Sequence, residues 1–164
     1  MTRAPSPLVA RYRGKLAILD TNLLLLHWCA SFEPALIGTF KRLNTFTVGD
    51  VTTLQSLLES FSVLCTTPHV LTEVSNLANS LKLRDKRDWA SHLSEQIETV
   101  AEEWISAKEI ATEPMFHLGI TDACLCRLAS KYVILTIDFP LSNYLETKKL
   151  NVINFNHLRE MQYQ

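Results

Sequence analysis

Short apolar segments that alternate with helical segments constrain the fold of this chain more than any other feature. Residues 15–20 (KLAILD) contain four consecutive apolar residues, a pattern typical of a strand covered on both faces. Residues 62–66, 132–136 and 151–155 predict three further strands in the same way. Helices are predicted between the strands, and strands joined in this manner form a parallel sheet through right-handed crossovers. We therefore expect an α/β fold with a parallel sheet of about four strands.

The helical segments carry recognisable start signals. Thr67 and Pro68 supply a cap and a first-position proline, and Thr121 is expected to cap a helix that runs to about residue 130. Asp50 is interpreted as a cap of a helix over residues 50–61. The charged stretch 83–104 predicts one longer helix with a solvated face. Further predictions are a helix at 23–28 and one at 140–148, a connection at 109–119, and an ambiguous segment at 32–47.

Length and composition bound the domain organisation. The 164 residues correspond to about one domain, and no internal repeat is visible. We expect a loose leader at residues 1–14, with little to bury, followed by a single domain at 15–164. The net charge of −1 excludes a global positive field that would draw the protein onto nucleic acid, so any basic surface must be local.

Two observations predict a cytoplasmic protein without a membrane span. No segment approaches the roughly 18 consecutive apolar residues of a membrane helix, and the first seven residues lack the apolar region of a secretory signal. The cysteines lie among aliphatic residues and lack zinc-site spacing, so we interpret them as reduced, buried thiols. The five histidines are scattered and are interpreted as structural or exposed. The cysteines are Cys29, Cys65, Cys124 and Cys126.

Four acidic residues interrupt apolar segments, which distinguishes them from the rest of the 17 acidic residues. Asp20 and Asp138 end the first and third predicted strands. Asp122 begins the helix before the third strand, and Glu73 lies near the second turn of the helix after the second strand. Carboxylates are rarely buried unless they are paired or bind metal, and the crevice beyond the carboxyl ends of parallel strands is the usual ligand site. Our hypothesis is that all four face one pocket.

Clustered carboxylates need a counter-charge. Two carboxylates about 5 Å apart repel each other by roughly 3 kcal/mol at an effective dielectric constant of about 20. Apart from Arg127, on the helix of Asp122, no basic residue adjoins any of the four in sequence. Mg²⁺ or Mn²⁺ suits carboxylates and water better than Zn²⁺ does. One or two such ions activate water and neutralise charge on a phosphodiester, which makes metal-dependent phosphodiester hydrolysis the leading hypothesis.

Each acid also has a simpler interpretation that stays open. Asp20 belongs to the sequence Asp-Thr-Asn, whose residues are favoured in turns and at helix N-caps. Asp138 precedes Phe-Pro, as a helix N-cap would. A first-turn acid such as Asp122 is favoured by the helix dipole. Glu73 is also compatible with an ordinary position at the edge of its helix's apolar face.

Taken in order, the motifs Asp-Thr-Asn (20–22), Glu73, Thr-Asp-Ala (121–123) and Thr-x-Asp (136–138) resemble those of the PIN domain nucleases over residues 15–155. The resemblance implies a three-layer α/β/α sandwich and a Mg²⁺- or Mn²⁺-dependent ribonuclease. It also implies that the four acids hold the metal and the attacking water. It also implies that neighbouring polar residues orient those carboxylates or touch phosphate. These are Thr21, Asn22, Thr121 and Thr136.

The resemblance also implies partners. Many bacterial members are toxins that form homodimers and are silenced by an antitoxin, so an RNA substrate, an antitoxin and a second copy are expected. The leader and the stretch 83–104 depart from the small toxins. Candidate RNA-binding residues follow the predicted helix of Glu73, with smaller basic pairs at 41–42 and 148–149; solvated surface charge is the competing interpretation. The candidates are Lys82, Arg84, Lys86, Arg87 and Arg127.

Two other function classes remain open. The first is a catalytically silent scaffold of the same fold that binds RNA or a protein. The second is a phosphatase or phospho-acceptor domain with Asp20 as nucleophile. The second lacks an acid two residues on, where Asn22 stands, and lacks the lysine expected after a strand.

Overall fold

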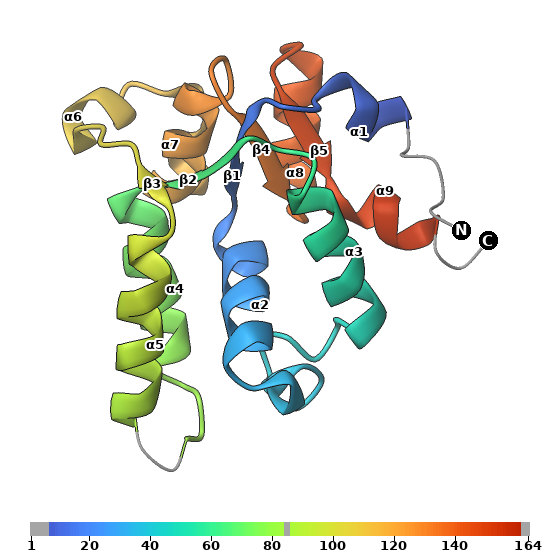
Figure 1. Ribbon diagram of the computed structural model, residues 1–164. Coiled ribbons are helices and arrows are strands. Elements are labelled where there is room, and N and C mark those ends of the chain that lie inside the picture. Colours follow the sequence, from blue (N-terminus) through green and yellow to red (C-terminus); the bar gives the residue numbers. More distant parts are fainter. Residues whose placement is uncertain (1–6, 84–85, 162–164) are drawn as a thin grey trace.

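A five-stranded, all-parallel sheet lies at the centre of the structure, a computed structural model that describes residues 7–83 and 86–161 (Figure 1). The strand order is β3-β2-β1-β4-β5, with β1 and β4 as central neighbours. β4 is buried along its whole length, as its apolar sequence predicts. The α/β class and the parallel sheet are therefore confirmed. The strands are β1 (Leu16–Leu19), β2 (Val63–Thr66), β3 (Ala101–Glu102), β4 (Val133–Thr136) and β5 (Val152–Asn154).

The expected count of about four strands is one too low, because β3 lies inside the stretch predicted as one long helix. The helix there spans only Lys86–Glu98, and the chain then pairs with β2, with Glu102 opposite Thr66. β3 has two residues, both exposed, at the edge of the sheet. A strand this short and exposed carries no apolar run, so the pattern used for the other strands does not detect it.

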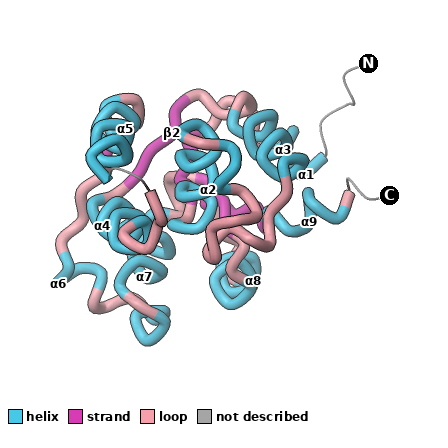
Figure 2. Tube along the Cα trace, turned by 90° about the horizontal axis from the view of Figure 1, so that it is seen from below, coloured by secondary structure: helices cyan, strands magenta, loops and turns pink. Residues whose placement is uncertain are grey.

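Helices connect the strands and cover both faces of the sheet. Figure 2 shows α3 on one side of the strands and α7 and α8 on the other, which confirms the three layers. No helix in the described residues is both long and apolar enough to cross a membrane. The helices are α1 (Pro7–Arg11), α2 (Thr21–Phe32), α3 (Val48–Leu58), α4 (Pro68–Ala78), α5 (Lys86–Glu98), α6 (Ala107–Ile110), α7 (Ile120–Leu128), α8 (Phe139–Thr147) and α9 (Phe155–Glu160), with short 3₁₀ turns η1 (Pro34–Leu36) and η2 (Pro114–Leu118).

The helix starts show which local signals act. Thr67 caps α4 and Pro68 follows it, as predicted. α7 begins earlier than predicted: its N-cap is Gly119, not Thr121. Gly119 has a φ of 134°, which side chains rarely adopt, so glycine suits this entry into the helix. α3 is capped by Thr47, while Asp50 is the reciprocal partner in a capping box rather than the cap itself.

Part of the expected leader packs on the domain. Residues 1–6 lie outside the described residues, but Pro7–Arg11 forms α1, with Val9 only 8% exposed. Tyr12, just after this helix, is 3% exposed and belongs to the core. The interpretation of residues 7–14 as loose is therefore wrong, because two apolar side chains anchor them.

Helix α2 is the element that positions the site. Most of its side chains are buried, including Leu23, Leu24, Leu25 and Leu26, and it contacts both α4 and α3. A helix enclosed in this way has little freedom to shift, so its first turn is held firmly at the end of β1. The four cysteines are free and buried, as predicted.

Candidate functional site

Asp20 stands where β1 ends and α2 begins, and its carboxylate is held by three donors. The backbone N–H of Leu23 donates to Oδ1 at 2.9 Å, so Asp20 caps α2. The Thr136 hydroxyl and the Ile137 N–H, the latter at 3.1 Å, donate to Oδ2. Because β1 and β4 are adjacent, residues 116 positions apart meet here. The cap interpretation of Asp20 is correct, and Oδ2 is bound in addition to the capping oxygen.

Burial dominates the ionisation of Asp20. The side chain is 6% exposed, and loss of hydration raises its pKa from 3.8 to about 6. The hydrogen bonds from Thr136, Leu23 and Ile137 lower the pKa, and the charge of Asp138 raises it. The net rise shows that three donors do not compensate for burial. Asp20 therefore carries a charge that a cation would stabilise further.

Asp138 and Thr136 complete the end of β4. Asp138 caps α8 by accepting the Leu141 N–H at 2.7 Å, so the cap interpretation of Asp138 holds. The Asp138 N–H donates to the Thr136 hydroxyl oxygen at 2.9 Å, and that hydroxyl donates to Asp20. A short chain of hydrogen bonds thus links the two loops that carry Asp20 and Asp138. Thr136 orients a carboxylate, as the family resemblance implies.

Glu73 reaches the same region from α4. Its Oε2 accepts a 2.9 Å hydrogen bond from the hydroxyl of Thr21, the first residue of α2. Thr21 is 6% exposed, so this bond is shielded from water on one side. The packing of α2 on α4 brings the two together across 52 residues of sequence. Thr21 thus orients Glu73, while Asp20, the residue before Thr21, is held by Thr136 at the end of the adjacent strand β4.

Asp122, in the first turn of α7, is close enough to the other three acids to interact with their charges. Burial raises its pKa from 3.8 to about 6, and the charges of Asp138, Glu73 and Asp20 each raise it further. Among the described residues no hydrogen bond to its carboxylate is found. The four acids therefore gather at the carboxyl end of the sheet from four separate segments of the chain.

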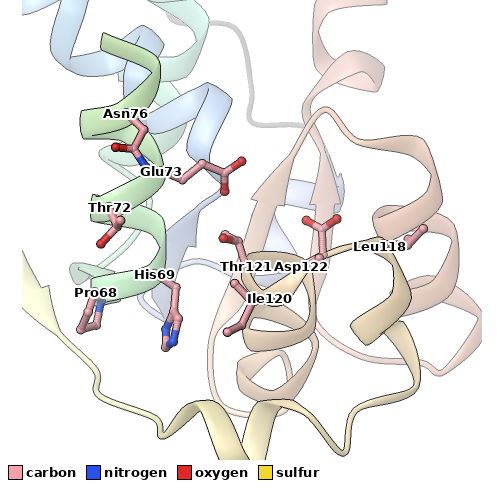
Figure 3. A pocket seen from close by; sticks show the side chains of 10 residues that line it. Pro68, His69, Thr72, Glu73, Asn76, Leu118, Ile120, Thr121 and Asp122 are labelled. Atoms are coloured by element: carbon pink, nitrogen blue, oxygen red, sulfur yellow. The ribbon is translucent and has the colours of Figure 1, made fainter. Parts of the chain in front are cut away.

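A cavity of about 560 Å³ opens between α4 and α7 (Figure 3). Glu73 and Asp122 both line it, whereas Asp20 and Asp138 are not among its lining residues. Thr121 lies on the same wall as Asp122, opposite Glu73. The cavity gives a ligand access to two of the four carboxylates directly.

His69 also lines this cavity, a placement that the interpretation of the histidines did not anticipate. Its Nδ1 is buried and finds no hydrogen-bond partner among the residues that the structure describes. His69 precedes Glu73 by four residues on α4, and residues four apart lie on the same face of a helix. This spacing could have indicated that His69 lies beside Glu73. Because the five histidines are scattered along the sequence, nothing singled out His69 for this comparison.

The cluster lacks a protein counter-ion. Across residues 7–83 and 86–161, none of the ion pairs involves Asp20, Glu73, Asp122 or Asp138. Over the same residues, no three His, Cys, Asp or Glu side chains come close enough to enclose a metal ion. In the described residues, the four carboxylates are neighbours whose charges no basic side chain neutralises, and they do not form a closed set of metal ligands.

The candidate RNA-binding residues are dispersed. Lys82 follows α4 and is exposed, and Lys86 donates from α5 to the backbone oxygen of Asn79 at 2.9 Å. Arg87 is exposed on α5, and Arg84 lies outside the described residues. Arg127 lies near the end of α7 and pairs with Glu113 at 3.5 Å. None of the described candidates lines the cavity of Glu73 and Asp122.

No protein-family model matches this sequence, and no curated protein does. The resemblance to PIN domain nucleases therefore stays a prediction from the motifs, and the geometry described above has to support any function assigned to the chain.

Proposed function

We propose that this protein is a divalent-metal-dependent nuclease that hydrolyses phosphodiester bonds in RNA, with a PIN-like acidic site. One observation carries the proposal: Asp122 lies close enough to Asp138, Glu73 and Asp20, on separate elements, that their charges add to the effect of burial in raising its pKa. Clustering of like charges lowers stability, so such a cluster is maintained where a cation or a reaction needs it. Its position beyond the carboxyl ends of parallel strands is the usual ligand position of such sheets.

The donor chemistry fits Mg²⁺ or Mn²⁺. All four groups offer carboxylate oxygens, and Mg²⁺ keeps several waters while binding one or two carboxylates. A fully enclosed protein cage is therefore not required. Asp20, Glu73, Asp122 and Asp138 would hold the metal, one or two of them directly and the others through its bound waters, and the metal would activate water and neutralise charge on the phosphodiester.

The chain's own polar groups position these carboxylates. Three donors hold Asp20 so that its orientation is set before a ligand arrives. Thr21 fixes one oxygen of Glu73 and leaves the other available. Asp122 accepts no hydrogen bond from the described residues, so both of its oxygens are available to a ligand. Asp138 is held by the Leu141 N–H, so the site combines three anchored acids with one unanchored acid at the cavity wall.

A catalytically silent scaffold that binds RNA or a protein is the second candidate. It is favoured by one observation, that no three-residue metal-ligating group is found among the described residues. The two candidates differ in their response to Mn²⁺. A toxin role, an antitoxin partner and a homodimer are further expectations of the resemblance.

The decisive experiment measures cleavage of a labelled single-stranded RNA with Mn²⁺, with Mg²⁺ and with EDTA, together with the melting temperature under each condition. Metal-dependent cleavage and a rise in melting temperature with Mn²⁺ are expected, because a ligand that binds the folded state stabilises it. Thermal stabilisation without cleavage would contradict the nuclease. Absence of both would favour the scaffold.

A further inference from the structure

A second cavity, of about 850 Å³, lies between the loop after η1 and the end of α4. It collects three cations from two distant segments: Lys41 and Arg42 from the loop, and Lys82 from beyond α4. None of the described residues that line it is acidic. The pair at 41–42 lies about 40 residues before Lys82 in the sequence, so the grouping is a result of the tertiary structure. We call this cavity the basic groove.

The three cations of the basic groove have no internal counter-ion. All three are exposed, and none takes part in an ion pair with a carboxylate in the part of the chain that the structure describes. In a protein with a net charge of −1, three unpaired cations around one concavity form a local positive field. Such a field attracts a polyanion through its phosphates.

The groove lies beside the acidic site. Asn22 lines the groove, and its neighbour Thr21 donates the hydrogen bond to Glu73. Glu73 and Lys82 are also connected through α4, with Lys82 beyond its C-terminal end. The five residues of α4 from Glu73 to Ala78 correspond to about 7.5 Å at 1.5 Å of rise per residue, and the four residues from there to Lys82 add at most about 15 Å, a span that a few nucleotides cross. One strand can therefore contact both places.

The walls of the groove favour an unpaired strand. Leu36, Phe40 and Leu81 form an apolar part of the lining, and side chains such as Asn44 and Thr45 offer hydrogen-bonding groups. Cations that follow the backbone together with a concave surface for sugars and bases are typical of single-strand binding. A duplex offers mainly its phosphates to such a surface.

We propose that the basic groove binds the backbone of single-stranded nucleic acid flanking the bond presented to the acidic cluster. The identity of the strand as substrate rests on the proposed nuclease function, whereas binding can be measured without cleavage. Lys41, Arg42 and Lys82 contact phosphates, and Asn22 marks the end of the groove nearest the acids.

The test uses a fluorescently labelled single-stranded oligouridylate in EDTA, with affinity measured by anisotropy at several salt concentrations. The variant Lys41→Gln/Arg42→Gln/Lys82→Gln should lose at least about tenfold in affinity at low salt. Its slope of log K against log salt should be shallower by about 2, since each single-strand phosphate contact contributes about 0.7. The charge-retaining variant Lys41→Arg/Arg42→Lys/Lys82→Arg should bind like the wild type. Melting temperatures should be unchanged, because all three side chains are exposed.

The matched control removes the same charge elsewhere. Arg13→Gln/Lys15→Gln/Lys108→Gln changes three exposed cations that do not line the groove and should alter affinity less than about twofold. Equal losses in both triple variants would overturn the proposal, as would wild-type affinity in the groove variant. Tighter binding of a duplex of the same length, or equal competition by polyglutamate, would also overturn it.

Cleavage assays separate this proposal from the nuclease proposal. If both hold, the groove variant has a raised KM with an unchanged kcat, while Asp122→Asn loses cleavage and keeps binding. If the wild type cleaves RNA and the groove variant keeps its KM and affinity, only the groove proposal fails. If the wild type binds the oligouridylate through the groove but does not cleave it with either metal, only the nuclease proposal fails.

Discussion

The hydroxyl of Thr136 donates a hydrogen bond to Oδ2 of Asp20, joining the ends of two adjacent strands across 116 residues of sequence. The same hydroxyl oxygen accepts the N–H of Asp138 at 2.9 Å. One side chain thus stabilises the charged form of Asp20 and positions the loop that carries another acid.

Replacing Thr136 with valine should destabilise the protein by roughly 2 kcal/mol at pH 8, because a hydrogen bond to a charged group is lost. The loss should be smaller near pH 5, where Asp20 is protonated, given its pKa of about 6. Urea unfolding at both pH values measures the difference. Thr52→Val is the matched control, since Thr52 is exposed and its hydroxyl bonds only the backbone of its own helix. Equal losses at both pH values would contradict the assignment.

The variant Asp122→Asn should abolish metal-dependent RNA cleavage and raise the melting temperature in EDTA. The reason for the second effect is that repulsion from Asp138, Glu73 and Asp20 disappears while no described hydrogen bond is lost. Asp20→Asn should also abolish cleavage, with a smaller thermal gain, because an amide NH₂ cannot accept from Thr136 and Ile137 as Oδ2 does. Calorimetry and a cleavage assay test both. Unfolding of both variants would show that these acids are structural.

The metal-free protein should become more stable as the pH falls from about 7 to about 4. Asp20 and Asp122 have folded pKa values of about 6 against 3.8 in the unfolded chain, so the folded state binds protons over this range and the unfolded state does not. For buried Asp20 the effect is on the order of 2–3 kcal/mol, since one pKa unit is about 1.4 kcal/mol. The two charged carboxylates therefore destabilise the folded state fully above their folded pKa of about 6. They have no such effect below the unfolded pKa of 3.8.

His27 acts in the opposite direction, because burial lowers its pKa. The measurement is therefore the difference in unfolding free energy between the wild type and Asp20→Asn/Asp122→Asn, followed against pH in EDTA. A difference that does not change between pH 4 and pH 7 would refute the placement of these two acids.

Breaking the ion pair between Arg159 and Asp50 should be costly. Arg159 on α9 donates to both oxygens of Asp50, at 3.0 and 3.2 Å, and Asp50 is fully buried. Arg159→Met should lose about 3–5 kcal/mol, because it leaves a buried charge unpaired. Arg127→Met, which removes an exposed partner of Glu113, should lose less than about 1 kcal/mol. Similar losses in the two variants by urea unfolding would contradict this difference.

Predictions from sequence succeeded where a local pattern has one physical cause. The apolar segment before Asp20 becomes a buried strand because its side chains have to leave water, and Thr67 caps α4 through its own hydroxyl. They failed where the cause was distant or weak. β3 forms because its backbone completes an edge next to β2, and α7 starts at Gly119 because of a backbone conformation that the residue pattern did not suggest.

The sequence by itself determined the α/β sheet and the positions of Asp20 and Asp138 at strand ends, because strand periodicity and capping depend on neighbouring residues. Only the tertiary structure decided that Thr21 binds Glu73, that His69 shares a cavity with Asp122, and that Lys41 joins Lys82. These relationships depend on how helices pack across the sheet, and packing depends on the fit of many distant side chains at once.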